Sequence, residues 1–174
     1  LNPGQFIVVY GRVNSDAKRF SVNLLRGARR IQEPGAEAAL HLDFRFDEGQ
    51  IVMNTMVQTL KWGEEERIPN PFRRGAEFHI IIRAYLNEFE ILANHKKITD
   101  YKMRLPLNSI QYLTVYGDIT VLGARLSADW PKRLPIRTSF DGGHFLIGEW
   151  FSGVFSFVFF CLGCIYRVAK NSFI

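Results

Sequence analysis

Hydrophobic and polar residues alternate in short runs from residue 6 to about residue 126. Most runs end at Gly, Asn, Asp or Pro, and none sustains a helical period. Run starts lie mostly about eight to twelve residues apart, which is typical of a β-sandwich or jelly roll. The pattern predicts an all-β, jelly-roll β-sandwich of two antiparallel sheets. The expected strands are residues 6–13, 19–25, 38–46, 50–57, 65–68, 78–85, 89–94, 97–101, 109–116 and 119–126.

The strand expected at 38–46 is the most informative, because successive side chains of a strand point to opposite faces. Large apolar side chains fill one face and polar side chains fill the other. The apolar set is Leu40, Leu42, Phe44 and Phe46, and the polar set is His41, Asp43 and Arg45. We expect the apolar set in the core and the polar set on a wetter face.

The segments that follow add to this polar face. A tight hairpin after residue 46 would place Asn54 beside the row formed by His41, Asp43 and Arg45. Glu65 and Arg67 are two residues apart and would share a face, and Trp62 lies just before them. One sheet face would then hold charged groups fixed by mutual salt bridges beside an indole.

A pyranose sugar is a ligand that fits such a face. Its hydroxyls both donate and accept hydrogen bonds, and each one left unpaired on burial costs about 1 kcal/mol or more. Charged partners make stronger hydrogen bonds to hydroxyls than neutral partners do. An indole offers a flat surface to the apolar face of the ring. The polar row therefore indicates a carbohydrate site.

The same residues resemble the galectin family. The family pattern is H-x-N-x-R, then V-x-N, then W-x-x-E-x-R, and this chain has HLDFR at 41–45, VMN at 52–54 and WGEEER at 62–67. The similarity covers about residues 3–126, and the combined pattern is specific. The resemblance implies a sandwich that binds β-galactosides of the lactose or N-acetyllactosamine type without a metal or other cofactor.

Roles for individual residues follow from the resemblance. His41 and Arg45 would bind the axial O4 of galactose, and Arg45 would also reach the ring oxygen. Asn54 and Glu65 would bind O6, and Trp62 would stack on the sugar.

The resemblance also implies a second set of contacts, to the next sugar. Glu65 and Arg67 would meet the O3 of a glucose or N-acetylglucosamine. The full implied carbohydrate-binding set is His41, Asp43, Arg45, Asn54, Trp62, Glu65 and Arg67.

Asp43 departs from the family, which has asparagine there. A carboxylate accepts hydrogen bonds but lacks the amide donor, and it could pair with Arg45 instead. This predicts an altered affinity or glycan preference. Nematode-like two-domain galectins are similar in having an altered residue here in their first domain, so the resemblance implies a first domain, with a second lectin domain or a dimer as partner. The alternative is a protein-interaction module that kept the fold while Asp43 altered the sugar site.

Three regions are predicted along the chain. Residues 1–127 form the galectin-like domain, in which the first strand of a galectin would already be running at Leu1. Residues 128–149 form a linker and the start of an incomplete second domain. Residues 150–174 form an apolar tail, with an uncharged run of 17 residues at 150–166, at the lower edge of the roughly 17–25 that span a bilayer. A membrane anchor, a buried strand pair and a mistranslated terminus stay open, and the anchor is not favoured.

Composition and charge exclude other classes of protein. Apolar residues make up 47% of the 174 residues and charged residues 22%, as in a globular domain. The two cysteines are too few for a disulfide framework or a four-ligand structural zinc site. Residues 1–129 carry 17 basic and 15 acidic groups, interleaved along the chain, so we expect no nucleic-acid partner.

An enzyme is also disfavoured. A glycosidase would use Asp43 and Glu65 as acid and base, but nearby arginines favour the ionised form of both.

The expected partners are β-galactoside glycans on glycoproteins or glycolipids. No signal peptide is visible, so the resemblance implies a cytoplasmic protein that is exported without one.

Overall fold

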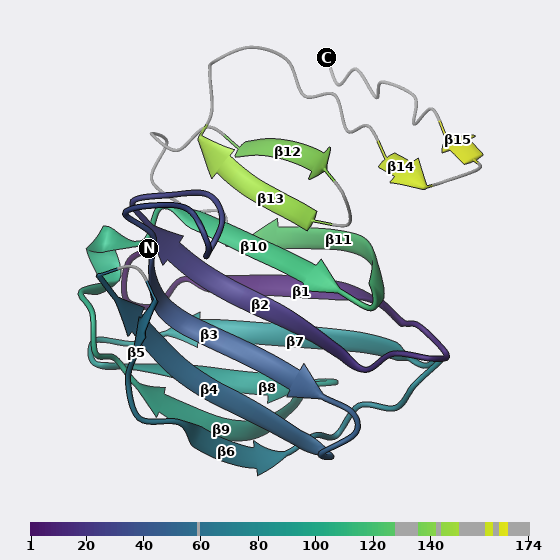
Figure 1. Ribbon diagram of the computed structural model, residues 1–174, viewed down its shortest axis with the longest axis horizontal. Coiled ribbons are helices and arrows are strands. Elements are labelled where there is room, and N and C mark those ends of the chain that lie inside the picture. Colours follow the sequence, from purple (N-terminus) through teal and green to yellow (C-terminus); the bar gives the residue numbers. More distant parts are fainter. Residues whose placement is uncertain (59, 128–135, 142–143, 150–158, 162–163, 167–174) are drawn as a thin grey trace.

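The computed structural model describes residues 1–58, 60–127, 136–141, 144–149, 159–161 and 164–166. Two antiparallel sheets pack against each other, and Figure 1 shows the larger sheet in front. The smaller sheet has the order β11-β1-β7-β8-β9. Its strands are β1 (Phe6–Val13), β7 (Glu77–Ala84), β8 (Glu88–Ala93), β9 (Lys96–Lys102) and β11 (Ile119–Leu126). The predicted all-β jelly-roll sandwich is confirmed.

The larger sheet has eight strands in the order β12-β13-β10-β2-β3-β4-β5, and β6 also pairs with β4. Its strands are β2 (Arg19–Arg26), β3 (Glu37–Arg45), β4 (Gln50–Val57), β5 (Lys61–Trp62), β6 (Glu66–Pro69), β10 (Tyr112–Gly117), β12 (Ile136–Asp141) and β13 (His144–Glu149). Because β2, β3 and β4 are neighbours both in sequence and in space, their polar faces form one continuous surface.

Three predicted strands have the bounds seen in β1, β4 and β11, five differ by one residue at one or both ends, and two regions need comment. The strand expected from residue 109 starts at Tyr112, because Leu107–Ser109 forms a short 3-10 helix after Pro106. The strand expected at 65–68 is β6, which starts at Glu66, and the two-residue strand β5 precedes it. Glu65 therefore lies in the bend between β5 and β6.

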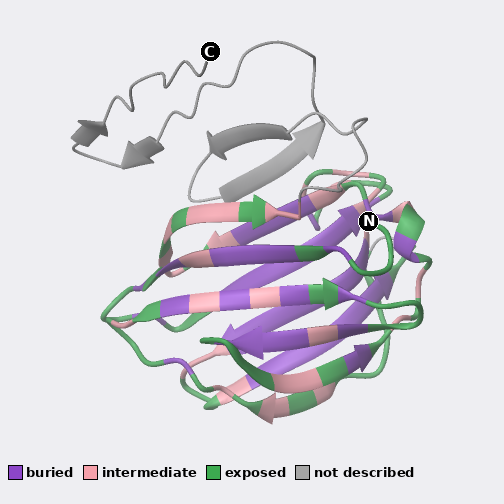
Figure 2. Cartoon of the chain, turned by 180° about the vertical axis from the view of Figure 1, so that it is seen from behind, coloured by how far each residue is buried: buried purple, intermediate pink, exposed green. Residues whose placement is uncertain are grey.

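Inward-facing side chains of both sheets meet in one core, and the buried stretches in Figure 2 follow the strands of both layers. An aromatic cluster lies at its centre. The rings of Phe20 and Phe44 are parallel, with centroids 4.3 Å apart, and Phe78 of the smaller sheet lies 5.2 Å from Phe20. Phe72 closes the cluster at 5.4 Å from Phe44. Each ring removes a large apolar area from water, so this cluster fixes how the two sheets pack.

Of the described C-terminal strands, β12 and β13 belong to the larger sheet, and β14 and β15 form a separate two-stranded sheet. β13 pairs with β10, with Leu113 opposite Ile147, and β12 pairs with β13. These strands fall within 128–149, where the sequence predicts a linker and the start of a second domain, and β14 (Phe159–Cys161) pairs with β15 (Cys164–Tyr166). The division into domains stays a prediction.

Most of the apolar tail lies outside the described residues. The run expected at 150–166 is described only at 159–161 and 164–166. Among the described residues, no helix has the length and hydropathy of a transmembrane span.

Removing one ring of the aromatic cluster tests how the sheets are held together. Phe44 has no exposed surface and stacks on Phe20. We expect Phe44→Ala to lower the free energy of unfolding by about 3–5 kcal/mol, because it leaves a cavity in the core. Leu86→Ala is the control, since Leu86 is 75% exposed and the change should cost less than about 0.5 kcal/mol. Urea unfolding of both variants measures the difference, and equal losses would contradict the packing described.

Candidate functional site

The predicted polar row of β3 lies on the side of the larger sheet that faces away from the core. Leu40, Leu42 and Phe44 are fully buried in the core, as the alternation predicts. Phe46, also expected in the core, lies just after β3 and is only partly buried against it. Neighbouring strands extend the row, because Arg19 of β2 lies opposite Arg45 and Asn54 of β4 lies opposite His41.

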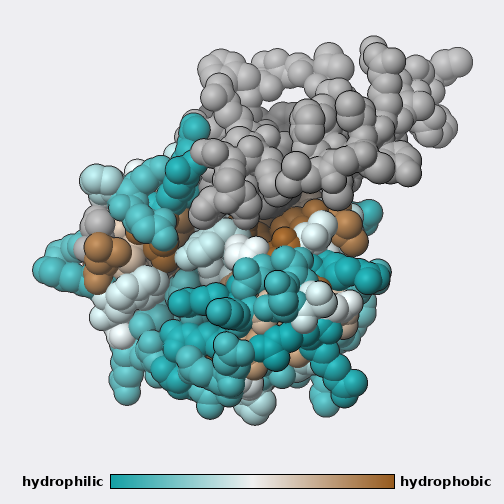
Figure 3. Space-filling view, turned by 45° about the vertical axis from the view of Figure 1, so that its right-hand side comes forward, coloured by the Kyte–Doolittle hydropathy of each residue, from teal (hydrophilic) through white to brown (hydrophobic). Residues whose placement is uncertain are grey.

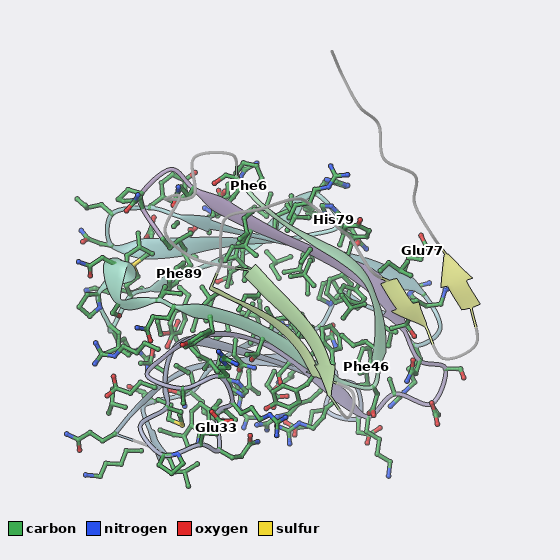
Figure 4. All side chains as sticks on the ribbon, turned by 90° about the horizontal axis from the view of Figure 1, so that it is seen from above. Phe6, Glu33, Phe46, Glu77, His79 and Phe89 are labelled. Carbon is green, nitrogen blue, oxygen red and sulfur yellow. The ribbon has the colours of Figure 1, made fainter. Side chains whose placement is uncertain are left out.

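A loop borders this outer side of the larger sheet. The loop after β2 includes Glu33, which lies on that side in Figure 4, whereas Glu77 and His79 of the smaller sheet lie on the far side of the molecule. The candidate site therefore lies between this loop and the strands of the larger sheet.

The expectation of a wet face is wrong for the centre of the row. Asp43 has no exposed surface and His41 is only 7% exposed. The Asp43 carboxylate is covered because two guanidinium groups bind it. Arg19 donates from Nε to Oδ1 at 3.0 Å and from Nη2 to Oδ2 at 2.5 Å, and Arg45 donates from Nε to Oδ2 at 2.7 Å. Asp43 is thus a buried anion between two partly exposed cations.

The ion pairs continue from Asp43 into a network of alternating charge. Arg45 contacts Glu48 at 3.1 Å and Glu65 at 3.8 Å. Arg67 contacts the same two carboxylates, at 2.9 Å and 2.5 Å. We call this network the charged row; its members are Arg19, Asp43, Arg45, Glu48, Glu65 and Arg67. Three cations balance three anions, so the surface offers many charge-assisted donors and acceptors without a net charge.

Hydrogen bonds to carboxylates raise the pKa of Arg45 and of Arg67, chiefly through Asp43 and Glu65 respectively. Both guanidinium groups are therefore cationic and held in place. In the view of Figure 3, hydrophilic side chains cover most of the described surface, and a narrower hydrophobic band borders them. Paired charges of this kind are individually weak contributors to stability, so their main effect is to fix geometry.

His41 is neutral at physiological pH. Burial lowers the pKa of its imidazole to about 4, and the nearby Asp43 carboxylate only partly opposes this effect. Nδ1 lies against the Oδ1 atom of Asn23, the residue opposite it on β2. A neutral imidazole that donates from Nδ1 has an acceptor at Nε2. The ring therefore offers a hydrogen-bond acceptor that does not change with pH near neutrality.

Asn54 is also buried and has defined partners. Its Nδ2 donates to the backbone oxygen of Gly63 at 2.9 Å, and its Oδ1 accepts from the backbone N–H of Thr55 at 2.7 Å. Gly63 N–H donates to the backbone oxygen of Thr55 at 2.9 Å. These bonds tie the segment after Trp62 to β4 and set the orientation of the Asn54 amide.

Trp62 forms one wall of an open hollow of about 360 Å³ beside His41. The two ring centroids lie 4.8 Å apart, and the indole is 42% exposed. Arg19 and Ser21 of β2 line the hollow, together with Ile31 from the following loop. The Ser21 hydroxyl is buried without a hydrogen-bond partner among the described residues.

Comparison with known proteins identifies the family. The family model for the galactoside-binding lectins matches residues 1–125. The chain belongs to the galactoside-binding lectin, or galectin, family. The resemblance expected from the sequence motifs is thereby confirmed.

Several relatives and solved structures are similar to this galectin. A 32 kDa β-galactoside-binding lectin of Caenorhabditis elegans is 41% identical over 119 residues, covering 68% of this chain and 42% of the relative. Human Galectin-7 is 35% identical over 127 residues, covering 72% and 90%. The crystal structure of C. elegans galectin LEC-6 matches with a TM-score of 0.64 at 25% identity, covering 72% and 84%. This galectin thus spans about two fifths of the length of the 32 kDa relative.

The structure brings the seven predicted residues of this galectin together on one surface. Their exposure to solvent differs. Trp62, Arg45 and Arg67 are accessible, whereas Asp43 is enclosed. Sequence reasoning missed Arg19, although the alternation of Arg19, Ser21 and Asn23 with apolar residues in β2 carries the same signal as in β3. Arg104 was also missed, since it follows β9 and no motif marks it.

Within the described residues, no group of three His, Cys, Asp or Glu side chains is placed to hold a metal ion.

The low pKa of His41 makes stability depend on pH in a defined window. The unfolded chain binds a proton at this histidine below about pH 6.5, whereas the folded chain does so only near pH 4. Stability is therefore fully present above about pH 6.5 and falls as pH drops to 4, by about 3 kcal/mol for this group alone. We expect His41→Gln to remove this part of the pH dependence in urea unfolding between pH 7 and pH 4. An NMR titration of His41 with a midpoint near 6.5 would contradict the account.

Proposed function

We propose that this galectin binds β-galactoside glycans, of the lactose or N-acetyllactosamine type, on the surface formed by Trp62 and the charged row. The observation that carries the proposal is the position of Arg45. Asp43 holds its Nε at 2.7 Å while its other nitrogens point towards Glu48 and Glu65. A guanidinium fixed in this way is preorganised to donate to a sugar hydroxyl.

The proposed contacts to galactose use the fixed groups around Trp62. His41 Nε2 accepts from the axial O4, and Arg45 donates to O4 and to the ring oxygen. Asn54 and Glu65 bind O6, and the exposed indole of Trp62 stacks on the C–H face of the ring. Since O4 is axial in galactose and equatorial in glucose, the His41 and Arg45 pair carries the specificity.

The second sugar is proposed to lie against Glu65 and Arg67. These two side chains are joined by hydrogen bonds of 3.0 Å and 2.5 Å and are about 40% exposed. They can therefore donate and accept at once, as the O3 hydroxyl of glucose or N-acetylglucosamine requires.

Asp43 is proposed to act through its two arginines. With no exposed surface, its carboxylate presents no atom to a ligand. We propose that aspartate in place of the family asparagine changes the site through Arg19 and Arg45, which both bind its carboxylate. The lectins named β-galactoside-binding in the comparison support the ligand class, since the chain is 41% and 40% identical to two of them.

We propose binding without catalysis. A glycosidase places two carboxyl groups on either side of the bond that it cleaves. Asp43 is enclosed and cannot flank a bound sugar, and the Glu65 carboxylate is engaged by Arg67.

The proposed partners are glycans on glycoproteins or glycolipids. Cross-linking would require a second lectin domain or a dimer, which raises avidity over that of one site. A solved relative, CG-16 from chicken liver, is a homodimeric agglutinin with a TM-score of 0.63 at 31% identity, covering 73% of this chain and 93% of CG-16. We further propose that the protein occurs both in the cytoplasm and outside the cell, as the family resemblance implies.

Calorimetric titration of the full chain with lactose tests the proposal. We expect saturable binding of lactose and none of sucrose, which lacks galactose. Arg45→Ala should weaken lactose binding by about tenfold to a hundredfold, because it removes charge-assisted hydrogen bonds of about 1.5–3 kcal/mol.

The matched control is Arg83→Ala. Arg83 forms a 3.0 Å ion pair with Glu90 on the smaller sheet, so its loss should leave lactose affinity unchanged. A folded chain that gives no heat with lactose would overturn the galactoside assignment and favour the protein-interaction alternative.

A further inference from the structure

Arg104 connects the end of β9 to the segment that carries Trp62 and Glu65. Its Nη1 donates to the backbone oxygen of Glu64 at 2.7 Å, and its Nη2 donates to the Glu66 carboxylate at 2.7 Å. Glu64 and Glu66 flank Glu65, a residue of the proposed sugar site. One guanidinium therefore holds the bend between β5 and β6 from both sides of Glu65.

The same guanidinium also reaches Asn54. Arg104 Nη1 donates to Asn54 Oδ1 at 3.4 Å, and the N–H of Thr55 donates to the same oxygen at 2.7 Å. Two donors on Oδ1 fix which end of the amide is the oxygen, because a reversed amide would place donors against donors. Nδ2 has two hydrogens, of which one goes to the backbone oxygen of Gly63. The second hydrogen is then available to a ligand hydroxyl.

Gly63 allows these groups to pack closely. A Cβ at this position would lie 2.9 Å from Arg104 Nη1 and 3.2 Å from Asn54 Oδ1. Any larger residue would push the guanidinium away from the amide. Gly63 in the WGEEER segment therefore has a packing role, in addition to its place beside Trp62.

Arg104 itself rests on the core. Its guanidinium lies 5.2 Å from the ring centroid of Tyr101, which has no exposed surface. The Tyr101 hydroxyl lies 2.9 Å from Thr55 Oγ1. Arg104 is therefore supported from below by a buried ring that is hydrogen-bonded to β4, next to Asn54.

We propose that Arg104 is a positioning residue for the galactoside site. It holds the β5–β6 bend, and it sets the Asn54 amide so that this side chain donates to the sugar O6 hydroxyl. The inference rests on the proposed function, since it concerns the same site. Arg104 touches no sugar in this account and acts through Asn54 and the bend at Glu65.

The test compares methyl β-D-galactoside with its 6-deoxy analogue, methyl β-D-fucoside, in titrations of the full chain. The parent chain should prefer the galactoside, because only this sugar has O6. Arg104→Ala should weaken galactoside binding by about tenfold and should also reduce the ratio of the two affinities by threefold or more. A residue that only stabilises the fold would not change this ratio. Arg104→Lys should recover part of the ratio, because an ammonium keeps the charge and can donate to some of these acceptors but lacks the planar fork of a guanidinium.

Arg74→Ala is the matched control. Arg74 also binds one backbone oxygen, of Ala17 at 2.7 Å, and one carboxylate, of Asp47 at 2.5 Å, and it lies 5.7 Å from the ring centroid of Phe46. It contacts none of the seven proposed sugar-binding residues, so both affinities and their ratio should stay as in the parent.

Three results would overturn the inference. The first is an Arg104→Ala variant with parental affinities. The second is an equal loss of affinity for both sugars, at any melting temperature, because Arg104 would then not act through the contact of Asn54 with O6. The third is a parent chain that binds neither sugar, which would refute the galactoside assignment as well.

Discussion

The alternation of side chains along β3 is the constraint on which the rest of this galectin depends. Leu40, Leu42 and Phe44 must enter the core, so His41 and Asp43 must project from the opposite side of the larger sheet. A shift of one residue in strand register would exchange the two sets and is therefore strongly disfavoured. Since β2 and β4 pair with β3 in fixed register, the packing of the core also positions their polar side chains. The same apolar contacts thus stabilise the sandwich and align the polar row.

Asp43 gives the charged row its particular electrostatics. A buried carboxylate without partners would be costly, and a bare pair of arginines would repel each other. Here Arg19 and Arg45 share one buried anion, and Glu48 and Glu65 balance the outer charges. The result is a neutral row of fixed donors and acceptors, which suits a neutral ligand that is rich in hydroxyls. His41 fits the same scheme, since its low pKa keeps it an uncharged acceptor.

Much of this could be predicted from the sequence, because strand alternation and turn chemistry are local. Alternation identified β3 and its polar set, and the family motif linked that set to Trp62 and Glu65. The burial of Asp43 at the centre of the row could not be predicted, because it depends on Arg19, which comes from another strand and lies over the carboxylate. The contacts of Arg104 depend on a loop reaching across the sandwich to the β5–β6 bend, and no local pattern encodes such a contact.

The most direct test of the central claim is a crystal structure of the full chain with bound lactose. We expect the galactose ring on the indole of Trp62, with O4 within hydrogen-bond distance of His41 Nε2 and the Arg45 guanidinium. We also expect Asp43 to stay enclosed by its two arginines and to make no contact with the sugar. Lactose bound elsewhere on the folded domain, or held directly by the Asp43 carboxylate, would contradict the account.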